Sequence, residues 1–329
     1  RKTIFLVTQA AFFAIALFLG VMDQSGAIRV WHLLASSALA GFFLSFEQPV
    51  RQSILHHLVP QAILPNAITL YQMVFNGSVL FGPSIGGALI PLVGTRGCFF
   101  IAAAGNLAVL GTIFLIRIPK APPQSAPKTV MRDMAEGFGI AWRTPVFFAL
   151  FGVLAIVTFC TKPYTQFMPV FARDILGVGA PGLGVLLMAP GAGAIVGGLA
   201  LASVHSFPAA GRLLFALGSG LAGAIIFFAA SRWFPLSLFF LFLAGGFHTT
   251  FLSSVATLLQ SHTNEMNRGR IMSFYGLINR GLGPMGAFPF GLVATAVGAP
   301  WTVALCGVLT IALVAYVTVY RGVLKELKP

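Results

Sequence analysis

Four ionisable side chains lie inside long apolar stretches of this sequence, where a charge is costly and is therefore a candidate for function: Glu47, Lys162, His248 and Arg280. A carboxylate such as Glu47 could gate a pathway or carry a proton, and His248 could relay one. Arg280 could attract an anionic substrate, and Lys162 could line a polar cavity. No nucleophile elbow, phosphate-binding loop or paired-carboxylate site is present, so the chemistry indicated is binding and proton transfer rather than catalysis.

Each of these residues also has a structural interpretation. Glu47 precedes Arg51 by four residues, a spacing that allows a salt bridge at a helix end. Lys162 could extend its ammonium toward the outer face of a membrane. His248 could be a satisfied packing residue, and Arg280 could be paired inside a bundle. The sequence leaves both interpretations open.

Three uncharged polar residues extend the set of cavity and coupling candidates. Tyr164 follows Lys162 by two positions and Asn279 precedes Arg280 directly, while Asn76 lies near the middle of another apolar stretch. No cluster of His, Cys, Asp or Glu has the spacing of a metal site, and no cofactor motif occurs. We therefore expect no metal and no cofactor.

The composition assigns the class. Hydrophobic residues make up 57% of the 329 residues and charged residues 8%, which is typical of an all-α polytopic membrane protein embedded in a lipid bilayer. The net charge of +13 does not indicate nucleic-acid binding, because the basic residues lie in short connections between apolar segments. About ten spans are predicted: Thr3–Met22, Val30–Glu47, Ala67–Val93, Gly97–Ile116, Pro145–Phe167, Gly182–Val204, Leu213–Ala230, Leu236–Leu259, Ile271–Val297 and Trp301–Tyr320.

The basic residues also predict orientation. With the N-terminus in the cytoplasm, 14 Lys and Arg residues fall on that side and 4 on the other, so both ends of this chain are expected to be cytoplasmic. The one long connection, 118–144, is Pro-rich and then has the spacing of a short amphipathic helix on the cytoplasmic surface. It divides the chain into an N-terminal bundle, 1–117, and a C-terminal bundle, 145–329.

The two bundles are related by an internal repeat. At an offset of 204 residues, Leu39–Phe43 matches Leu243–Phe247 at four of five positions, and four glycines of the first half meet glycines of the second. The matched glycines are Gly77, Gly82, Gly87 and Gly94 with Gly281, Gly286, Gly291 and Gly298. Parallel repeats of membrane helices are typical of secondary transporters with a central site between their halves. The offset leaves two spans of the second half without a counterpart, which predicts that the intact protein begins at least about 60 residues earlier.

A glycine- and proline-rich stretch, Asn76–Leu89, lies within one predicted span. Pro83 removes a helical N–H, so a bend is expected at Gly82-Pro83. Gly86 and Gly87 expose backbone one turn later and would let a neighbouring helix approach closely. The stretch is either a plain packing helix or a surface on which two halves move.

These motifs resemble the major facilitator superfamily. Gly82-Pro83-Ser84-Ile85-Gly86-Gly87 is similar to the antiporter motif in helix 5 of that family. In the second half of the chain, Gly283–Gly286 is a weaker match to the same motif. Pro49–Gln52 and Leu64–Ala67 resemble the helix 4–5 connection of the enterobactin-exporter-like and macrolide-efflux-like branch, and Pro169–Ala172 matches the same branch. The resemblance implies a twelve-helix fold of which this chain holds helices 3 to 12.

The resemblance implies a function as well. We expect a monomeric transporter in the bacterial inner membrane that exports an amphipathic small molecule, a drug or a siderophore, by proton antiport and alternating access. A nutrient importer, a membrane-embedded enzyme and a non-transporting remnant are the alternatives.

Overall fold

The computed structural model describes residues 2–58, 64–115, 139, 144–202 and 210–317. All secondary structure in this part of the chain is helical, which confirms the predicted all-α class. The chain divides into two compact units, Arg1–Ser125 and Ala126–Pro329.

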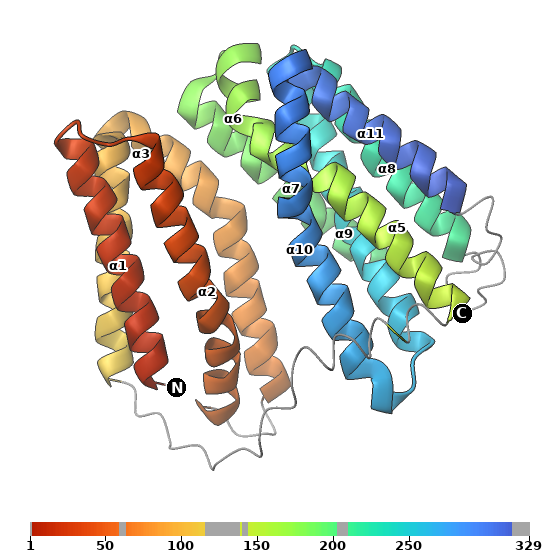
Figure 1. Cartoon of the computed structure of the whole chain (residues 1–329), viewed down its shortest axis with the longest axis horizontal. Helices are drawn as coiled ribbons and strands as arrows, with labels where there is room; N and C mark the ends of the chain where they lie inside the picture. Colours follow the sequence, from red (N-terminus) through yellow and green to blue (C-terminus); the bar gives the residue numbers. More distant parts are fainter. Residues whose placement is uncertain (1, 59–63, 116–138, 140–143, 203–209, 318–329) are drawn as a thin grey trace. The chain divides into compact units, whose positions relative to one another are not determined.

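The first unit is built from three labelled helices, α1 (Lys2–Gln24), α2 (Val30–Leu58) and α3 (Leu64–Leu115), which run lengthwise beside one another in Figure 1. α2 continues eleven residues beyond Glu47, where the sequence predicted the span to end. Helical hydrogen bonding therefore persists into the polar stretch that follows the apolar one, because hydropathy marks the membrane boundary rather than the helix end.

α3 consists of two helices joined at Gly94. The backbone of Gly94 has φ 71° and ψ 174°, a conformation that is essentially restricted to glycine. The predicted spans Ala67–Val93 and Gly97–Ile116 meet at this residue, so glycine separates two successive helices without an intervening loop.

The second of these helices packs against α1. A Cβ at Gly20 would lie 3.0 Å from Cε1 of Phe100, so the absence of a side chain at Gly20 lets the ring approach the helix. At one end the hydroxyl of Thr95 donates a hydrogen bond to the Asp23 carboxylate, and at the other Lys2 Nζ donates to the carbonyl of Phe114 over 3.2 Å. Polar contacts thus fix both ends of an apolar helix pair.

The second unit contains six longer helices and a broken segment. The helices are α5 (Pro145–Thr161), α7 (Gly179–Ala202), α8 (Ala210–Ala230), α9 (Phe234–Ser261), α10 (Glu265–Val297) and α11 (Ala299–Ala315) (Figure 1). Its hydrophobic core gathers fully buried side chains from several of them, among them Leu150, Phe228 and Phe251. This burial supplies rigid packing around the polar residues described below.

The broken segment follows α5. The last six residues of the predicted span Pro145–Phe167 form a 3-10 helix, η2 (Lys162–Phe167), instead of α-helix. A single α-turn, α6 (Met168–Val170), and a π-helical turn, η3 (Phe171–Ile175), continue beyond the predicted end. Pro163 lacks the N–H that would bond to the carbonyl of Phe159, so regular α-helix cannot continue through it unchanged.

Glycines let helices of this unit approach backbone to backbone. In the crossing of α7 with α9, a Cβ at Gly197 would lie 2.5 Å from the carbonyl oxygen of Gly246, and one at Gly193 would overlap the carbonyl oxygen of Phe242. Thr250 donates a hydrogen bond of 3.1 Å to the carbonyl of Gly197 across the same crossing. We call Gly193, Gly197, Gly245 and Gly246 the glycine seam.

The contact of α5 with α10 is also close. A Cβ at Gly286 would overlap the carbonyl oxygen of Phe159, which is the carbonyl that Pro163 leaves without its helical partner. The proline break and the facing glycine therefore act together, because only a residue without a side chain can lie against the freed carbonyl.

The internal repeat has a structural counterpart at Gly94 and Gly298. Gly298 separates α10 from α11 with φ 85° and ψ 158°, close to the φ 71° and ψ 174° of Gly94, its partner at the offset of 204. The two helix junctions share one glycine-specific conformation. The repeat therefore preserves backbone geometry as well as residue type.

Gly298→Ala is expected to destabilise the second unit by about 1–3 kcal/mol, because an alanine Cβ strains this backbone conformation. The measurement is the free energy of unfolding of the purified protein in detergent, by titration with a denaturing surfactant. Gly291→Ala is the control, since Gly291 is in helical α10 and no described atom lies within 4 Å of an added Cβ. Equal stability of the two variants would contradict the assignment of strain to Gly298.

Seven of the described helical segments are long and apolar enough to cross a membrane by length and composition. α10 is outside this set although it has 33 residues, because Asn279, Arg280 and two prolines lower its hydropathy. The predicted connecting helix within 118–144 lies outside the described residues apart from positions 139 and 144. The count of ten spans and the bundle boundaries stay predictions.

Candidate polar sites within the helical units

Lys162 and Asn279 meet in the second unit. Lys162 is the first residue of η2, and its Nζ donates a hydrogen bond of 2.9 Å to the backbone carbonyl of Asn279 on α10. The aliphatic stem of Lys162 lies across Gly283, where an added Cβ would be 2.6 Å from the lysine Cδ. The break in the helix after α5 and the glycine on α10 together hold this ammonium against a neighbouring helix.

Two further predicted residues belong to the same region. The charge of Arg280 acts on Lys162, and the charge of Lys162 acts on His248 of α9. The Arg280 side chain is exposed and the His248 side chain is half-buried. Residues that the sequence places 117 positions apart, Lys162 and Asn279, are thus in contact, and electrostatic effects relate Arg280 and His248 to Lys162.

The amide oxygen of Asn279 is a buried acceptor of this group whose hydrogen-bonding capacity is unused. It is buried, and no hydrogen-bond donor reaches it among the described atoms. A buried polar atom without a partner costs free energy, so such an atom points to a missing ligand or water.

Tyr164 lies elsewhere. Its side chain is 8% exposed and belongs to the hydrophobic core of the second unit. The sequence suggested Tyr164 as a cavity residue because of its distance of two positions from Lys162. Tyr164 lies in η2, and its role as a cavity residue stays a prediction.

In the first unit Glu47 is buried, with 2% of its surface exposed. Gln9 of α1 donates a hydrogen bond of 3.1 Å from Nε2 to Oε1 of Glu47 on α2. The sequence did not single out Gln9, although a glutamine inside an apolar helix is a signal of the same kind. The side chains of Arg51 and Asn76 lie outside the part of the structure that is described, so the predicted Glu47–Arg51 salt bridge is not tested.

The glycine motif Gly82-Pro83-Ser84-Ile85-Gly86-Gly87 lies in the first half of α3. The backbone remains helical through Gly82 and Pro83, and the non-helical residue of α3 is Gly94. Gly87 is buried. A Cβ added at Gly82 or Gly86 would meet no described atom within 4 Å, so the close helix approach predicted at Gly86 is not made by the described residues of the first unit.

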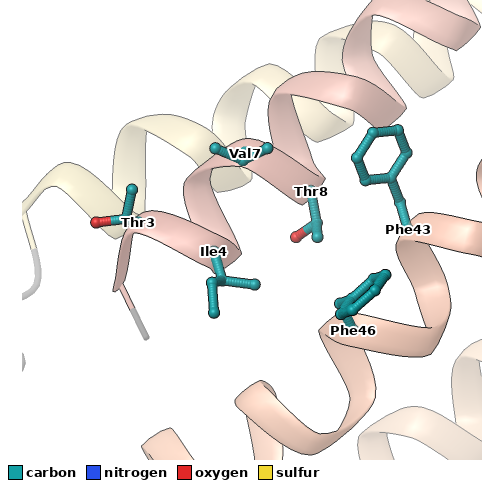
Figure 2. Close-up of a pocket in the computed structure, with 6 residues that line it drawn as sticks. All are labelled: Thr3, Ile4, Val7, Thr8, Phe43 and Phe46. Carbon is teal, nitrogen blue, oxygen red and sulfur yellow. The ribbon is translucent and has the colours of Figure 1, made fainter.

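A shallow pocket of about 180 Å³ lies between α1 and α2 (Figure 2). Four of its residues come from α1 and two, Phe43 and Phe46, from α2. It has no charged side chain, and the hydroxyl of Thr8 already donates to the carbonyl of Phe5 over 3.0 Å. The pocket is therefore apolar and offers little for specific recognition.

The glycine seam is the feature that sequence reasoning missed. Gly193 and Gly197 have the Gly-x-x-x-Gly spacing that is typical of closely packed membrane helices, so a signal was present in the sequence.

Comparison with known protein families decides the assignment. Residues 1–287 match the family described as Major Facilitator Superfamily. The chain belongs to the major facilitator superfamily. It is a multi-pass membrane protein of a transporter family rather than an enzyme.

Relatives of this superfamily member include efflux proteins. It is 27% identical to the multidrug efflux pump Tap of Mycolicibacterium fortuitum over 297 residues, which cover 88% of this chain and 71% of Tap. It is 27% identical to the multidrug resistance protein MdtG of Yersinia enterocolitica, over 83% of this chain and 65% of MdtG. It is 26% identical to the uncharacterised transporter YfiS of Bacillus subtilis, over 70% of this chain and 58% of YfiS.

Solved structures share the fold. A bacterial homologue of the human lysosomal transporter Spinster, inward-facing and occupied, matches with a TM-score of 0.69 at 18% identity, over 98% of this chain and 81% of that one. A POT family transporter in complex with a thioalcohol-conjugated peptide matches with a TM-score of 0.74 at 10% identity, over 99% and 82%. At these identities the likeness concerns the fold of the superfamily.

Proposed function

We propose that this protein exports an amphipathic small molecule across the bacterial inner membrane in exchange for protons. The observation that carries the proposal is the similarity to the efflux pump Tap over 88% of the chain. Membership of the superfamily supplies the transporter fold on which alternating access depends.

Three features of the chain support this direction and mechanism. The antiporter-like motif Gly82–Gly87 lies on α3, as in exporters of the family that it resembles. Glu47 provides a buried acid in one unit, and Lys162 with Arg280 provides cations in the other. The resemblance to the enterobactin-exporter-like and macrolide-efflux-like branch favours a drug or a siderophore-like compound as the substrate.

The location and assembly belong to the same proposal. The distribution of basic residues supports the cytoplasm as the site of both ends of this chain. We also propose that one copy of the protein is the transporting unit, because the superfamily fold places its site within one chain.

The test uses everted membrane vesicles that contain the protein, energised to acidify their interior. N-phenyl-1-naphthylamine, an amphipathic dye that fluoresces in the membrane, is the probe. An exporter would remove the dye from the outer leaflet on energisation, and a protonophore would reverse the change. Dye loss in right-side-out vesicles instead would support the importer. 8-Anilinonaphthalene-1-sulfonate is tested in parallel. The proposal is overturned if neither dye shows an energy-dependent change in either orientation.

A further inference from the structure

Lys162 and Arg280 have no carboxylate partner among the described side chains of the second unit. Lys162 and Arg280 act on each other as like charges. The sequence contains no Asp or Glu between Asp174 and Glu265, and none from there to Glu326. Asp174 lies on η3 beside Arg173, with its Oδ1 3.7 Å from the arginine Nε, and both side chains are exposed. Helices α7, α8, α9 and α11 therefore bring no carboxylate to Lys162 and Arg280.

Two uncompensated cations inside a membrane protein are costly. A charge within the bilayer is normally paired, or it faces a polar pathway. The Nζ of Lys162 is held by its hydrogen bond to the Asn279 carbonyl of α10. One hydrogen bond to a neutral carbonyl leaves two of the three ammonium hydrogens available.

The neighbouring groups add directional hydrogen-bonding capacity. Arg280 offers the planar fork of its guanidinium, which suits carboxylate, sulfonate and phosphate oxygens. His248 of α9 is within the electrostatic influence of Lys162 and can donate a ring N–H. The buried Oδ1 of Asn279 is unpartnered among the described atoms, and it can accept from a hydroxyl of a bound acid.

The position of Lys162 is fixed by packing. Its stem crosses Gly283, where a Cβ would lie 2.6 Å from Cδ and 3.2 Å from Cγ. A side chain at residue 283 would therefore displace the ammonium. The glycine at this position keeps the cation at the level of Asn279 and Arg280 on α10.

We infer that Lys162, Arg280, His248 and Asn279 form a binding site for the anionic group of the transported molecule, so that the substrate class is an amphipathic organic acid. This inference rests on the proposed function, since it names the substrate of the same transporter. A bound carboxylate or sulfonate would provide the negative charge that no described side chain brings to Lys162 and Arg280, and the surrounding apolar helices would hold the rest of the molecule.

The test compares two dyes with the same aromatic skeleton. 8-Anilinonaphthalene-1-sulfonate carries a sulfonate, and N-phenyl-1-naphthylamine is its neutral counterpart. Binding is measured as the shift in melting temperature of the purified protein in detergent at increasing dye concentration, and transport is measured in everted vesicles. We expect the sulfonate to stabilise the protein at a concentration at least about tenfold lower than the neutral dye, because charge-assisted hydrogen bonds distinguish the two.

Five variants locate the site. Lys162→Met keeps the stem and removes the charge, and Arg280→Gln removes the exposed cation; each is expected to abolish the preference for the sulfonate. Gly283→Ala keeps both charges but displaces Lys162, and is expected to weaken the preference. Gly281→Ala is its control, because the one described atom within 4 Å of a Cβ there is a Leu277 methyl at 3.9 Å. Arg280→Lys should retain the preference and so separate charge from packing.

The outcomes separate the inference from the proposed function. Equal binding of both dyes by the wild-type protein, or a preference that survives both Lys162→Met and Arg280→Gln, overturns the anion site. Energy-dependent movement of the dyes without such a preference would leave the exporter intact and refute the inference. Sulfonate-specific binding that these variants abolish, without transport in either direction, would support the site and refute the exporter.

Discussion

Gly197→Val is expected to prevent stable folding of the second unit, whereas Gly198→Val, one residue further along the same helix, is expected to fold. A Cβ at Gly197 would lie 2.5 Å from the carbonyl oxygen and 2.7 Å from the Cα of Gly246, and these backbone atoms cannot rotate away. At Gly198 no described atom lies within 4 Å of an added Cβ. The two substitutions add the same side chain to neighbouring positions of α7, so the change in helix propensity is the same in both variants.

The expected cost at Gly197 is more than about 3 kcal/mol, the upper end of overpacking penalties, because α7 and α9 must separate and lose the contacts along their length. Separation would also remove the hydrogen bond from Thr250 to the carbonyl of Gly197. The measurement is the fraction of monodisperse protein in detergent, followed by the free energy of unfolding. Comparable yield and stability of the two variants would show that the α7–α9 crossing is not closely packed.

The helices and the junctions between them are the part of the fold that the sequence predicts. Hydrophobic segments of suitable length predict the helices, because a membrane requires every backbone polar group to be bonded within its own segment. The repeat predicts the matched junctions, since Gly94 and Gly298 share a backbone conformation that other residues avoid. These features depend on interactions between residues that are close together in the sequence.

Contacts between helices depend on information that is not local. Gly41 and Gly245 are partners at the offset of 204, yet a Cβ at Gly245 would overlap the carbonyl oxygen of Pro190, while one at Gly41 meets no described atom within 4 Å. The residue type is the same, but a helix crosses one glycine and no described helix crosses the other. Sequence repetition therefore predicts backbone geometry better than it predicts packing partners.

The candidate site illustrates the same limit. The rule that intramembrane charges are functional candidates singled out Lys162 and Arg280 separately. Their association requires the break at Pro163, which turns Lys162 toward α10, and the space that Gly283 leaves for its stem. The rule equally singled out Glu47, but its hydrogen bond to Gln9 depends on how α1 and α2 are paired.

Glu47→Gln is expected to uncouple transport from the proton gradient. Glutamine has the same shape as glutamate, and its amide oxygen can accept the hydrogen bond that Gln9 Nε2 now donates to Glu47 Oε1 over 3.1 Å. The substitution therefore retains this link between α1 and α2 while removing a group that can bind and release a proton. If Glu47 carries the coupling proton, dye export driven by the gradient should fall at least about tenfold, with little change in the free energy of unfolding.

The decisive measurement separates driven export from exchange. Driven export is measured as the uptake of labelled dye into everted vesicles with a proton gradient. Exchange is measured as the loss of preloaded labelled dye from everted vesicles without a gradient but with unlabelled dye outside. A coupling role for Glu47 predicts that Glu47→Gln loses driven export and keeps exchange, since exchange requires the conformational change but no net proton movement.

Asp174→Asn is the matched control for charge, because Asp174 is an exposed acid beside Arg173 at the end of the broken segment. It should retain both activities. If Glu47→Gln instead lowers stability by about 1 kcal/mol or more and leaves driven export unchanged, Glu47 is a structural residue at a helix–helix contact. The coupling acid would then have to be sought elsewhere in the protein.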